Sequence, residues 1–412
     1  MSIAPPLVRP AKTGGRQAVA GQPAQGATSG RFDYGVFVVI VVTLCLVGLL
    51  MVLSASSVSS LQTYGNPWYY FERQGVFLVL GAFAFFVAQR MKLAFWQRMA
   101  RSLLVVATLG LLVVLVHGRS AGGASRWIGV GSLEFQPSEL AKLAVVLFAA
   151  DVLARREGKG SWSYRAGPVL TVLVVFGLLI IKQPDLGTAV VVCAIGLAVL
   201  FAAGLPLSWL GVAGGLATLG GIGLAVTAPY RLARITSFLN PGAHATTSGY
   251  QSIQGLIALA TGHLTGAGIG QSLASWGYLP NQYTDFIYAV IGQETGLVGA
   301  TIILALFALI GVVGTRIAWR APTTFESLLA AGITAWLVLQ GIVNAGAVAG
   351  VLPVTGVPLP FVSYGGTSLV IDLFASGLVA NVARHSLTAS LPPASGGGLE
   401  GAGSLDASGA AS

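Results

Sequence analysis

The chain has 412 residues, of which 55% are hydrophobic and only 8% are charged, and its formal net charge is +9. Because a soluble domain carries about 25% charged residues, this composition excludes a soluble globular protein and predicts an integral membrane protein. Apolar runs of roughly 20 residues recur along the chain, which excludes a barrel of short alternating strands. The basic residues are spread over short loops rather than gathered in one patch, so the positive charge indicates membrane topology and not nucleic-acid binding.

The apolar runs predict an all-α fold with ten transmembrane helices within residues 34–385. In chain order the predicted helices cover 34–56, 74–89, 102–117, 137–154, 165–182, 187–204, 207–227, 284–314, 325–349 and 363–384. The Gly-, Ala-, Pro- and Ser-rich ends, residues 1–33 and 386–412, are predicted to be disordered tails. Residues 228–283 form an unusually long loop between the seventh and eighth helices, and their Tyr, Trp, Ile and Leu content predicts that this loop is ordered.

The distribution of Lys and Arg predicts which side of the membrane each loop faces. Ten helices put both termini on one side, and if that side is the cytoplasm, 15 basic residues lie inside and 6 lie outside. The positive-inside rule therefore predicts that both termini are cytoplasmic. It also places the 228–283 loop, the loop that carries Arg126 and the proline-containing stretch before the tenth helix on the outer face. No strong internal repeat is visible, which argues against a pseudosymmetric transporter.

The stretch YLPNQYTDFIYAVIGQETG, which runs from Tyr278 to Gly296, brings two carboxylates to the membrane surface. Ionisable side chains near lipid are costly, so Asp285 and Glu294 are candidate functional groups. On one helix these two residues would lie about 180° and about 13 Å apart, so they could not flank the same bond. Asp285 is thus either a lone catalytic candidate or a helix N-cap, and the residues alone leave both interpretations open. Glu294 is interpreted as a structural group inside the bundle.

The fourth predicted helix begins with QPSELAK, which places Glu139 and Lys142 on one helix face. The two residues form either an internal ion pair or, together with Arg126 of the preceding Gly-rich loop, part of a cavity for an anion. Arg126 is the better anion candidate, since a guanidinium can hold a phosphate through two hydrogen bonds.

Two further segments could line the same outer cavity. The stretch from Asn344 to Ser368 contains three prolines and cannot form a continuous helix. It is therefore either a re-entrant plug or a cavity wall, and it contains Pro353, Ser363, Gly365 and Gly366. The 228–283 loop contributes Arg231 and Gln251.

Several of these blocks resemble the SEDS family (shape, elongation, division and sporulation), whose members are peptidoglycan glycosyltransferases. The matching blocks are GGASRWI, QPSELAK, QPDLGTA, YQSIQ, GAGIG, LPNQYTDFI followed by ETG, and the C-terminal signature from Asn344 to Ser368. They follow the order of the family over residues 33–385. The MVLSASS of the first helix and the long tails resemble the division-type FtsW branch more than the RodA branch.

The resemblance implies that the chain polymerises lipid II, a disaccharide-peptide on undecaprenyl diphosphate, during septal wall synthesis in the bacterial cytoplasmic membrane. It implies that Asp285, in the TDF motif, is the essential aspartate. One carboxylate suits this reaction, because a sugar diphosphate already has a good leaving group and needs only a base for the acceptor hydroxyl. The other candidate site residues are expected to contact the substrate (Arg126, Lys142, Glu139, Arg231, Gln251 and Ser363) or to support the site (Glu294, Pro353, Gly365 and Gly366).

The resemblance also implies partners, namely a class B penicillin-binding transpeptidase and other divisome proteins. The sequence contains no metal-ligand cluster and requires no cofactor, although a divalent cation, Mg or Mn, could help stabilise the departing diphosphate. Asn281 and Gln293 stand where the family often has Glu, which argues against a mechanism that needs a second acid in this stretch.

Other classes of function stay open at this stage. A lipid II flippase or an ion-coupled transporter would also use intramembrane charges, but its polar site would lie at the membrane midplane between repeats. A scaffold that recruits the transpeptidase is a third hypothesis. Within the family, a RodA-type elongation polymerase is the alternative.

Overall fold

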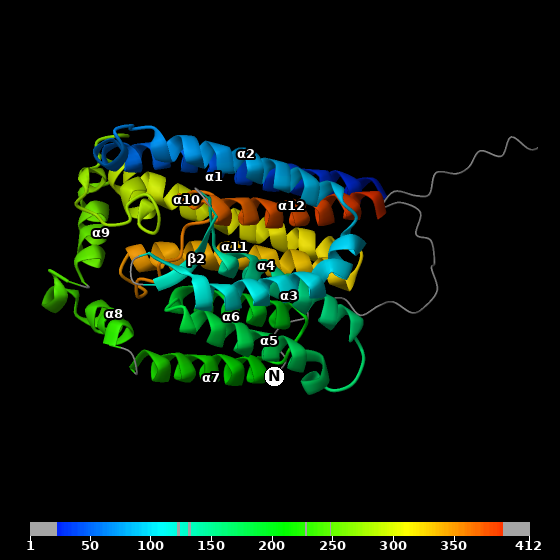
Figure 1. The fold of residues 1–412 in the computed structure, drawn as a ribbon. Helices are drawn as coiled ribbons and strands as arrows, with labels where there is room; N and C mark the ends of the chain where they lie inside the picture. Colours follow the sequence, from blue (N-terminus) through cyan, green and yellow to red (C-terminus); the bar gives the residue numbers. More distant parts are fainter. Residues whose placement is uncertain (1–22, 122–123, 131–132, 227–228, 248, 390–412) are drawn as a thin grey trace, which may run out of the picture.

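In the computed structural model, the described residues are 23–121, 124–130, 133–226, 229–247 and 249–389, and the long helices run side by side along one direction (Figure 1). Most of the predicted tail residues lie outside this part of the chain. The long helices are α1 (Pro23–Tyr64), α2 (Tyr69–Arg90), α3 (Leu93–His117), α4 (Pro137–Arg155), α5 (Trp162–Lys182), α6 (Leu186–Ala202), α7 (Leu207–Val226), α10 (Ile287–Arg320), α11 (Thr324–Val348) and α12 (Gly366–Ala389).

Seven of the described helices are long and apolar enough to cross a membrane, namely α1, α2, α3, α5, α10, α11 and α12. The chain is therefore a multi-pass membrane protein. The other three predicted spans coincide with α4, α6 and α7, so ten crossings, and with them the cytoplasmic position of both termini, stay a prediction.

Helix α4 lies at the centre of the bundle and contacts α3, α5, α6, α11 and α12. Almost all of its side chains are buried, including three charged ones. Small residues let its neighbours approach closely: a Cβ on Gly332 of α11 would lie 2.8 Å from Val146 of α4 and 2.6 Å from Val199 of α6. Close contact at glycine is how membrane helices pack when hydrophobic burial drives them only weakly.

The prediction of an all-α chain was incomplete, because the Arg126 loop folds into a small antiparallel sheet. Its strands β1 (Arg119–Ala121), β2 (Ala124–Val130) and β3 (Leu133–Phe135) are ordered β1-β2-β3, with β2 in the middle. Pairing of Gly129 with Glu134 fixes the register of the second hairpin. The strands are short and Gly-rich, so their hydrophobic alternation is too weak to be recognised in the sequence.

The predicted outer loop is ordered and helical in large part, as its composition suggested. It contains α8 (Pro229–Leu239), η1 (Pro241–His244), α9 (Tyr250–Thr261) and η2 (Leu273–Trp276), and α8 and α9 lie at one end of the bundle (Figure 1). Its last part packs on α10 backbone to backbone. A Cβ on Gly262 would lie 1.9 Å from the carbonyl oxygen of Gly292, and one on Gly266 would lie 2.1 Å from that of Glu294.

Several helix ends differ from the prediction; for example, α2 begins at Tyr69 instead of residue 74 and α3 at Leu93 instead of residue 102. Helix α1 begins at Pro23 instead of residue 34, and its buried Asp33 forms an ion pair with Arg320 at the end of α10. Helix α10 begins at Ile287 and is kinked at Gly296, whose φ of 69° interrupts the helix. Helix α12 begins at Gly366, so the residues from 349 to 365, here called the Pro-rich segment, connect α11 to α12 without regular structure.

Candidate functional site

Asp285 lies in a tight turn, residues 281–286, directly before α10. The turn closes through the carbonyl oxygen of Asn281, which accepts from the amides of Thr284 (3.1 Å) and Phe286 (3.2 Å). Asn281 has a φ of 57°, a conformation that asparagine tolerates better than most residues. Asn281 is thus a residue suited to this position of the turn.

The structure decides one alternative that the sequence left open for Asp285. The N-cap position of α10 is Phe286, whose own side chain forms no capping hydrogen bond. Asp285 is therefore not the N-cap, and the premise that it shares a helix with Glu294 was wrong.

The backbone around Asp285 is held by one hydrogen bond to each of three successive carbonyl groups. The carbonyl of Tyr283 accepts from the amide of Tyr364 (2.8 Å), and that of Thr284 accepts from the hydroxyl of Ser363 (2.6 Å). The carbonyl of Asp285 itself accepts from Nδ2 of Asn344 (2.8 Å). Side-chain position at a reacting centre depends on such supports, so the Pro-rich segment and α11 fix where the carboxylate stands.

Arg126 of β2 meets Asp285 at Gly356 of the Pro-rich segment. A Cβ on Gly356 would lie 3.5 Å from Oδ2 of Asp285 and 3.6 Å from Nη1 of Arg126. Asp285 is half-buried and the Arg126 side chain is 16% exposed, so neither is sealed from a substrate. The predicted convergence of the Arg126 loop, the proline-containing stretch and Asp285 is therefore present.

Asp185, in the turn before α6, is a site residue that the sequence analysis missed. Its Oδ2 lies 3.5 Å from Nε of Arg126, and its carboxylate accepts from the amide (3.2 Å) and the hydroxyl (2.8 Å) of Thr188. The carbonyl of Pro184 accepts from Nη2 of Arg126 (2.9 Å). The guanidinium is thus oriented through Nε and Nη2, while Nη1 is directed toward Gly356. The QPDLG block was visible in the sequence, but its turn gave no sign of this partner.

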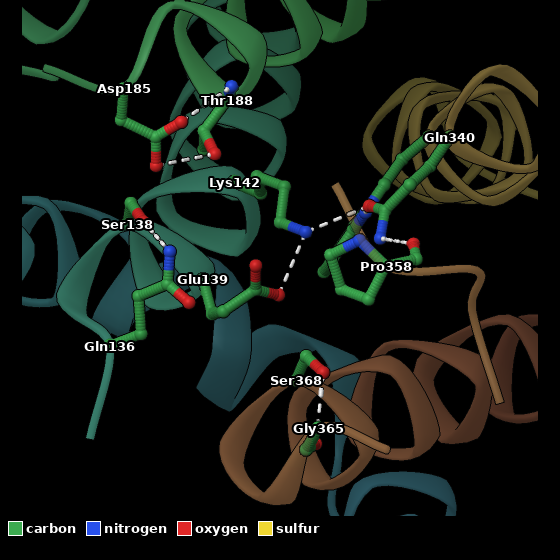
Figure 2. A network of polar contacts seen from close by, with 11 residues as sticks. Gln136, Ser138, Glu139, Lys142, Asp185, Thr188, Gln340, Pro358, Gly365 and Ser368 are labelled. Atoms are coloured by element: carbon green, nitrogen blue, oxygen red, sulfur yellow. Dashed lines mark hydrogen bonds and ion pairs between the residues drawn. The ribbon is translucent and has the colours of Figure 1, made fainter. Parts of the chain in front are cut away.

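Lys142 and Glu139 form the internal ion pair that was one of the two interpretations of QPSELAK. Nζ of Lys142 lies 2.7 Å from Oε2 of Glu139, and the two side chains are 1% and 2% exposed. Figure 2 shows Lys142 between Glu139 and Gln340, whose Oε1 accepts from Nζ at 2.8 Å. Gln340 in turn donates to the carbonyl of Pro358 (2.9 Å), so the ion pair is linked through Gln340 to the Pro-rich segment.

A second buried acidic side chain, Asp372 of α12, lies near this pair and was also missed. It is 1% exposed and lies within electrostatic range of both Lys142 and Glu139. Its Oδ1 accepts no hydrogen bond from any described group. Lys142, Glu139 and Asp372 therefore form one cluster of buried ionisable side chains, in which Lys142 is the only basic member.

Glu294 and Gln293 hold the outer loop against α10 and α1. Glu294 is buried and its Oε1 accepts from the hydroxyl of Ser54 (2.5 Å). Oε1 of Gln293 accepts from the hydroxyl of Ser272 and the amide of Ala274 (3.1 Å). These contacts are within the protein, which agrees with a supporting role.

The other candidate residues lie in several places. Ser363 is buried, and its hydroxyl also accepts from the amide of Leu359 (2.8 Å), so it acts within the protein. Gln251 of α9 donates to the carbonyl of Pro280 (3.2 Å) and so contacts the chain just before the Asp285 turn. The side chain of Arg231 lies outside the described part of the structure.

Of the three supporting residues of the C-terminal signature, Gly365 and Gly366 lie at the start of α12 and Pro353 lies earlier in the Pro-rich segment. Gly366 packs against α2, because a Cβ there would lie 2.6 Å from the ring of Phe77. A Cβ on Gly365 would lie 2.3 Å from Oγ of Ser368, and Pro353 is half-buried within the Pro-rich segment. Gly366 therefore fixes the approach of α12 to α2.

Two tyrosines flank the Asp285 turn. The ring centroids of Tyr283 and Tyr364 lie 5.9 Å apart in an edge-on arrangement. Burial raises the pKa of Tyr364 to about 12, and burial also raises the pKa of Tyr283. Both phenols therefore stay neutral at physiological pH and do not compete with Asp285 as a base.

The described residues contain no group of three His, Cys, Asp or Glu side chains that could hold a metal ion. The two carboxylates nearest the site, Asp285 and Asp185, both lie near Arg126. A guanidinium between two carboxylates does not form a cation site of the oxygen-rich kind that Mg²⁺ prefers.

Comparison with known proteins gives one family. The model of the family FTSW_RODA_SPOVE, described as "Cell cycle protein", matches residues 35–388. Stage V sporulation protein E of Bacillus subtilis is 39% identical over 353 residues, which cover 85% of this chain and 96% of that protein. A probable peptidoglycan glycosyltransferase FtsW of Coxiella burnetii is 40% identical over 370 residues, which cover 86% of this chain and 97% of that protein.

Solved structures agree with this result. A chain from a peptidoglycan synthase complex that coordinates polymerization and crosslinking superposes with a TM-score of 0.70 at 30% identity, covering 85% of this chain and 97% of its own length. The rod shape determining protein RodA of Thermus thermophilus superposes with a TM-score of 0.62 at 30% identity, covering 84% of this chain and 95% of its own length.

Proposed function

This chain belongs to the FtsW/RodA/SpoVE family of cell cycle proteins and is a peptidoglycan glycosyltransferase, and we propose that it polymerises lipid II with Asp285 as its general base. The observation that carries this proposal is the meeting of Asp285 and Arg126 at Gly356. A base and a cation on either side of one accessible point suit a reaction in which a proton leaves the acceptor and negative charge develops on a diphosphate.

In the proposed reaction, Asp285 takes the proton from the 4-hydroxyl of the GlcNAc of one lipid II molecule. The oxygen forms a bond to C1 of the MurNAc of the other chain, with inversion. The bond between C1 and the diphosphate oxygen breaks, and undecaprenyl diphosphate leaves with the electron pair. No second acid is required, because the diphosphate is already a good leaving group. This agrees with the amide side chains at positions 281 and 293.

Arg126 is the group that we assign to the departing diphosphate. The ion pair with Asp185 and the hydrogen bond from Nη2 to the carbonyl of Pro184 hold the guanidinium in place, so it is already oriented when the substrate arrives. Preoriented donors stabilise developing charge without reorganising. Lys142 is enclosed in its ion pair, and we therefore assign it to the support of the Pro-rich segment, through Gln340, and not to the substrate.

A divalent cation could still take part, but this site offers it few protein ligands. Mg²⁺ or Mn²⁺ would need diphosphate oxygens of the substrate for much of its coordination shell, and we assign no step to it. We further propose a class B transpeptidase as partner and a place in septal wall synthesis. The similarity to a chain of a peptidoglycan synthase complex supports the partner, and the FtsW relatives support the septal role.

The test compares the wild type with Asp285→Asn in a lipid II polymerisation assay, with lipid II binding measured separately. General-base catalysis contributes on the order of 10²–10⁴-fold, so we expect at least a hundredfold loss of rate with binding retained. Glu72→Gln, an exposed carboxylate in the first turn of α2, is the matched control and should polymerise normally. An Asp285→Asn protein that binds and polymerises lipid II at the wild-type rate would refute the proposal.

A further inference from the structure

A cavity of about 680 Å³ lies at the end of the bundle away from Asp285, where α12 finishes. Four basic side chains line it: Arg31 of α1, Arg90 at the end of α2, Lys92 of the following turn and Arg384 of α12. Its volume is within the range of small-ligand sites. The positive-inside prediction puts this end of the molecule in the cytoplasmic leaflet. The cavity plays no part in the proposed glycosyl transfer.

The walls of this cavity are held together by defined contacts. Nδ2 of the buried Asn381 donates to the carbonyls of Ala88 (2.8 Å) and Met91 (2.6 Å), which fastens the turn between α2 and α3 to α12. A Cβ on Gly30 would lie 2.7 Å from Cδ2 of Leu387, so α1 also packs closely on the end of α12. The basic residues of three elements are thereby brought to one place.

The positive charge of the cavity is poorly compensated within the described residues. Arg31 and Lys92 form no ion pair there, and Arg90 only stacks on the ring of Phe86, 4.7 Å from its centroid. The one carboxylate in the lining belongs to Glu326, which is contacted by His385 (3.0 Å). Several unpaired cations around one cavity attract an anion.

Exposed apolar residues stand next to two of the basic residues on α1 and α2. Phe32 follows Arg31 and is 65% exposed, and Phe86 on the last turn of α2 is 48% exposed. An apolar groove of about 460 Å³ begins at Phe32 and extends along α1, against Leu306 and Leu309 of α10, as far as Thr43. Residues 32–43 span about 16 Å of helix, a length suited to part of an acyl chain.

We propose that this basic cavity binds the phosphate headgroup of an anionic phospholipid. Its cations would contact the phosphate, as basic pockets between membrane helices do for such headgroups, and the exposed apolar residues beside them would contact the acyl chains. A free phosphate would use the cations but would have no use for the apolar surface, so the two sources can be separated by experiment.

The experiment measures binding of phosphatidylglycerol, phosphatidylcholine and inorganic phosphate to the purified full-length protein by native mass spectrometry and by titration of a fluorescent phosphatidylglycerol. The variant is the double substitution Arg31→Gln/Lys92→Gln, because both side chains are exposed and removing them should not disturb folding. Arg98→Gln is the matched control: it is an exposed arginine on α3 outside the cavity. Size-exclusion profiles and lipid II polymerisation report the fold.

We expect the wild type and Arg98→Gln to bind phosphatidylglycerol and not phosphatidylcholine, and the double variant to bind it at least tenfold more weakly, since each basic residue near a charged headgroup contributes to affinity. Equal binding of the two lipids, or an unchanged affinity in the double variant, would overturn the proposal. Competition by millimolar inorganic phosphate that abolishes lipid binding would assign the site to a soluble anion instead.

Discussion

Replacement of Lys142 by methionine tests whether this residue supports the fold or binds substrate. Lys142 and Glu139 lie 2.7 Å apart and are almost fully buried, so Lys142→Met leaves Glu139 without its partner in the bundle interior. Breaking a buried pair from one side costs about 3–5 kcal/mol. In a chain of this size that corresponds to a decrease in Tm on the order of 5–10 °C.

The expected loss differs between the two partners. Lys142→Met leaves the Glu139 carboxylate without a cation, whereas Glu139→Gln leaves Lys142 with its hydrogen bond to Gln340. Glu139→Gln should therefore lower Tm less than Lys142→Met. The double variant Glu139→Gln/Lys142→Met should recover part of the loss, because no unpaired member of the pair remains.

The assay is thermal unfolding of the detergent-solubilised protein, followed by size-exclusion fluorescence, together with lipid II polymerisation well below Tm. If Lys142→Met unfolds at the wild-type temperature and yet loses lipid II binding, Lys142 is a substrate group and the assignment to structural support is wrong. An equal loss in both single variants would instead show that the hydrogen bond to Gln340 does not compensate Lys142 for the loss of Glu139.

Three further substitutions follow from the site. Asn344→Ala removes the hydrogen bond that the Asn344 side chain donates to the Asp285 carbonyl, and should lower the polymerisation rate about 10–100-fold with lipid II binding unchanged. A lower affinity at an unchanged rate would contradict this. Arg126→Lys keeps the positive charge but loses the guanidinium group, which contacts Pro184 and Asp185 just before α6, and should lower the polymerisation rate roughly tenfold or more. Wild-type kinetics would show that the charge alone suffices. Gly187→Ala puts a Cβ 2.2 Å from a backbone oxygen of the Pro-rich segment and should destabilise by about 1–3 kcal/mol in thermal unfolding, whereas Gly211→Ala, with nothing within 4 Å, should not.

The positions of the long helices could be predicted from the sequence, because runs of apolar residues are long and unambiguous. The helix ends could not. Asp33 was predicted to be the last residue of the N-terminal tail, yet it lies within α1 and forms an ion pair with Arg320 of α10. Likewise α10 begins at Ile287 because a turn with a positive φ at Asn281 precedes it, and the hydrophobicity of the sequence does not predict that turn.

The candidate site was predictable in outline and not in its details. Asp285 and Arg126 could be placed on one face by topology, and they meet at Gly356. Asp185 and Asp372 were missed, because a carboxylate in a turn or in an apolar helix has no local signature of its partner. Their roles arise from contacts across 59 or more positions of the chain, which only the packing of α4, α6 and α12 determines.

The glycines that dock the outer loop on α10 have a practical consequence for labelling. Residues 262–268 lie backbone to backbone on 292–296, so an epitope or fluorophore inserted there would push the Asp285 turn away from its supports. Residues 242–247 instead form an exposed stretch after α8, in which Ala245 and Thr246 lie at the surface. Insertions are tolerated where backbone burial is low, so a short tag between these two residues should leave polymerisation intact and report from intact cells whether this loop lies on the predicted outer face.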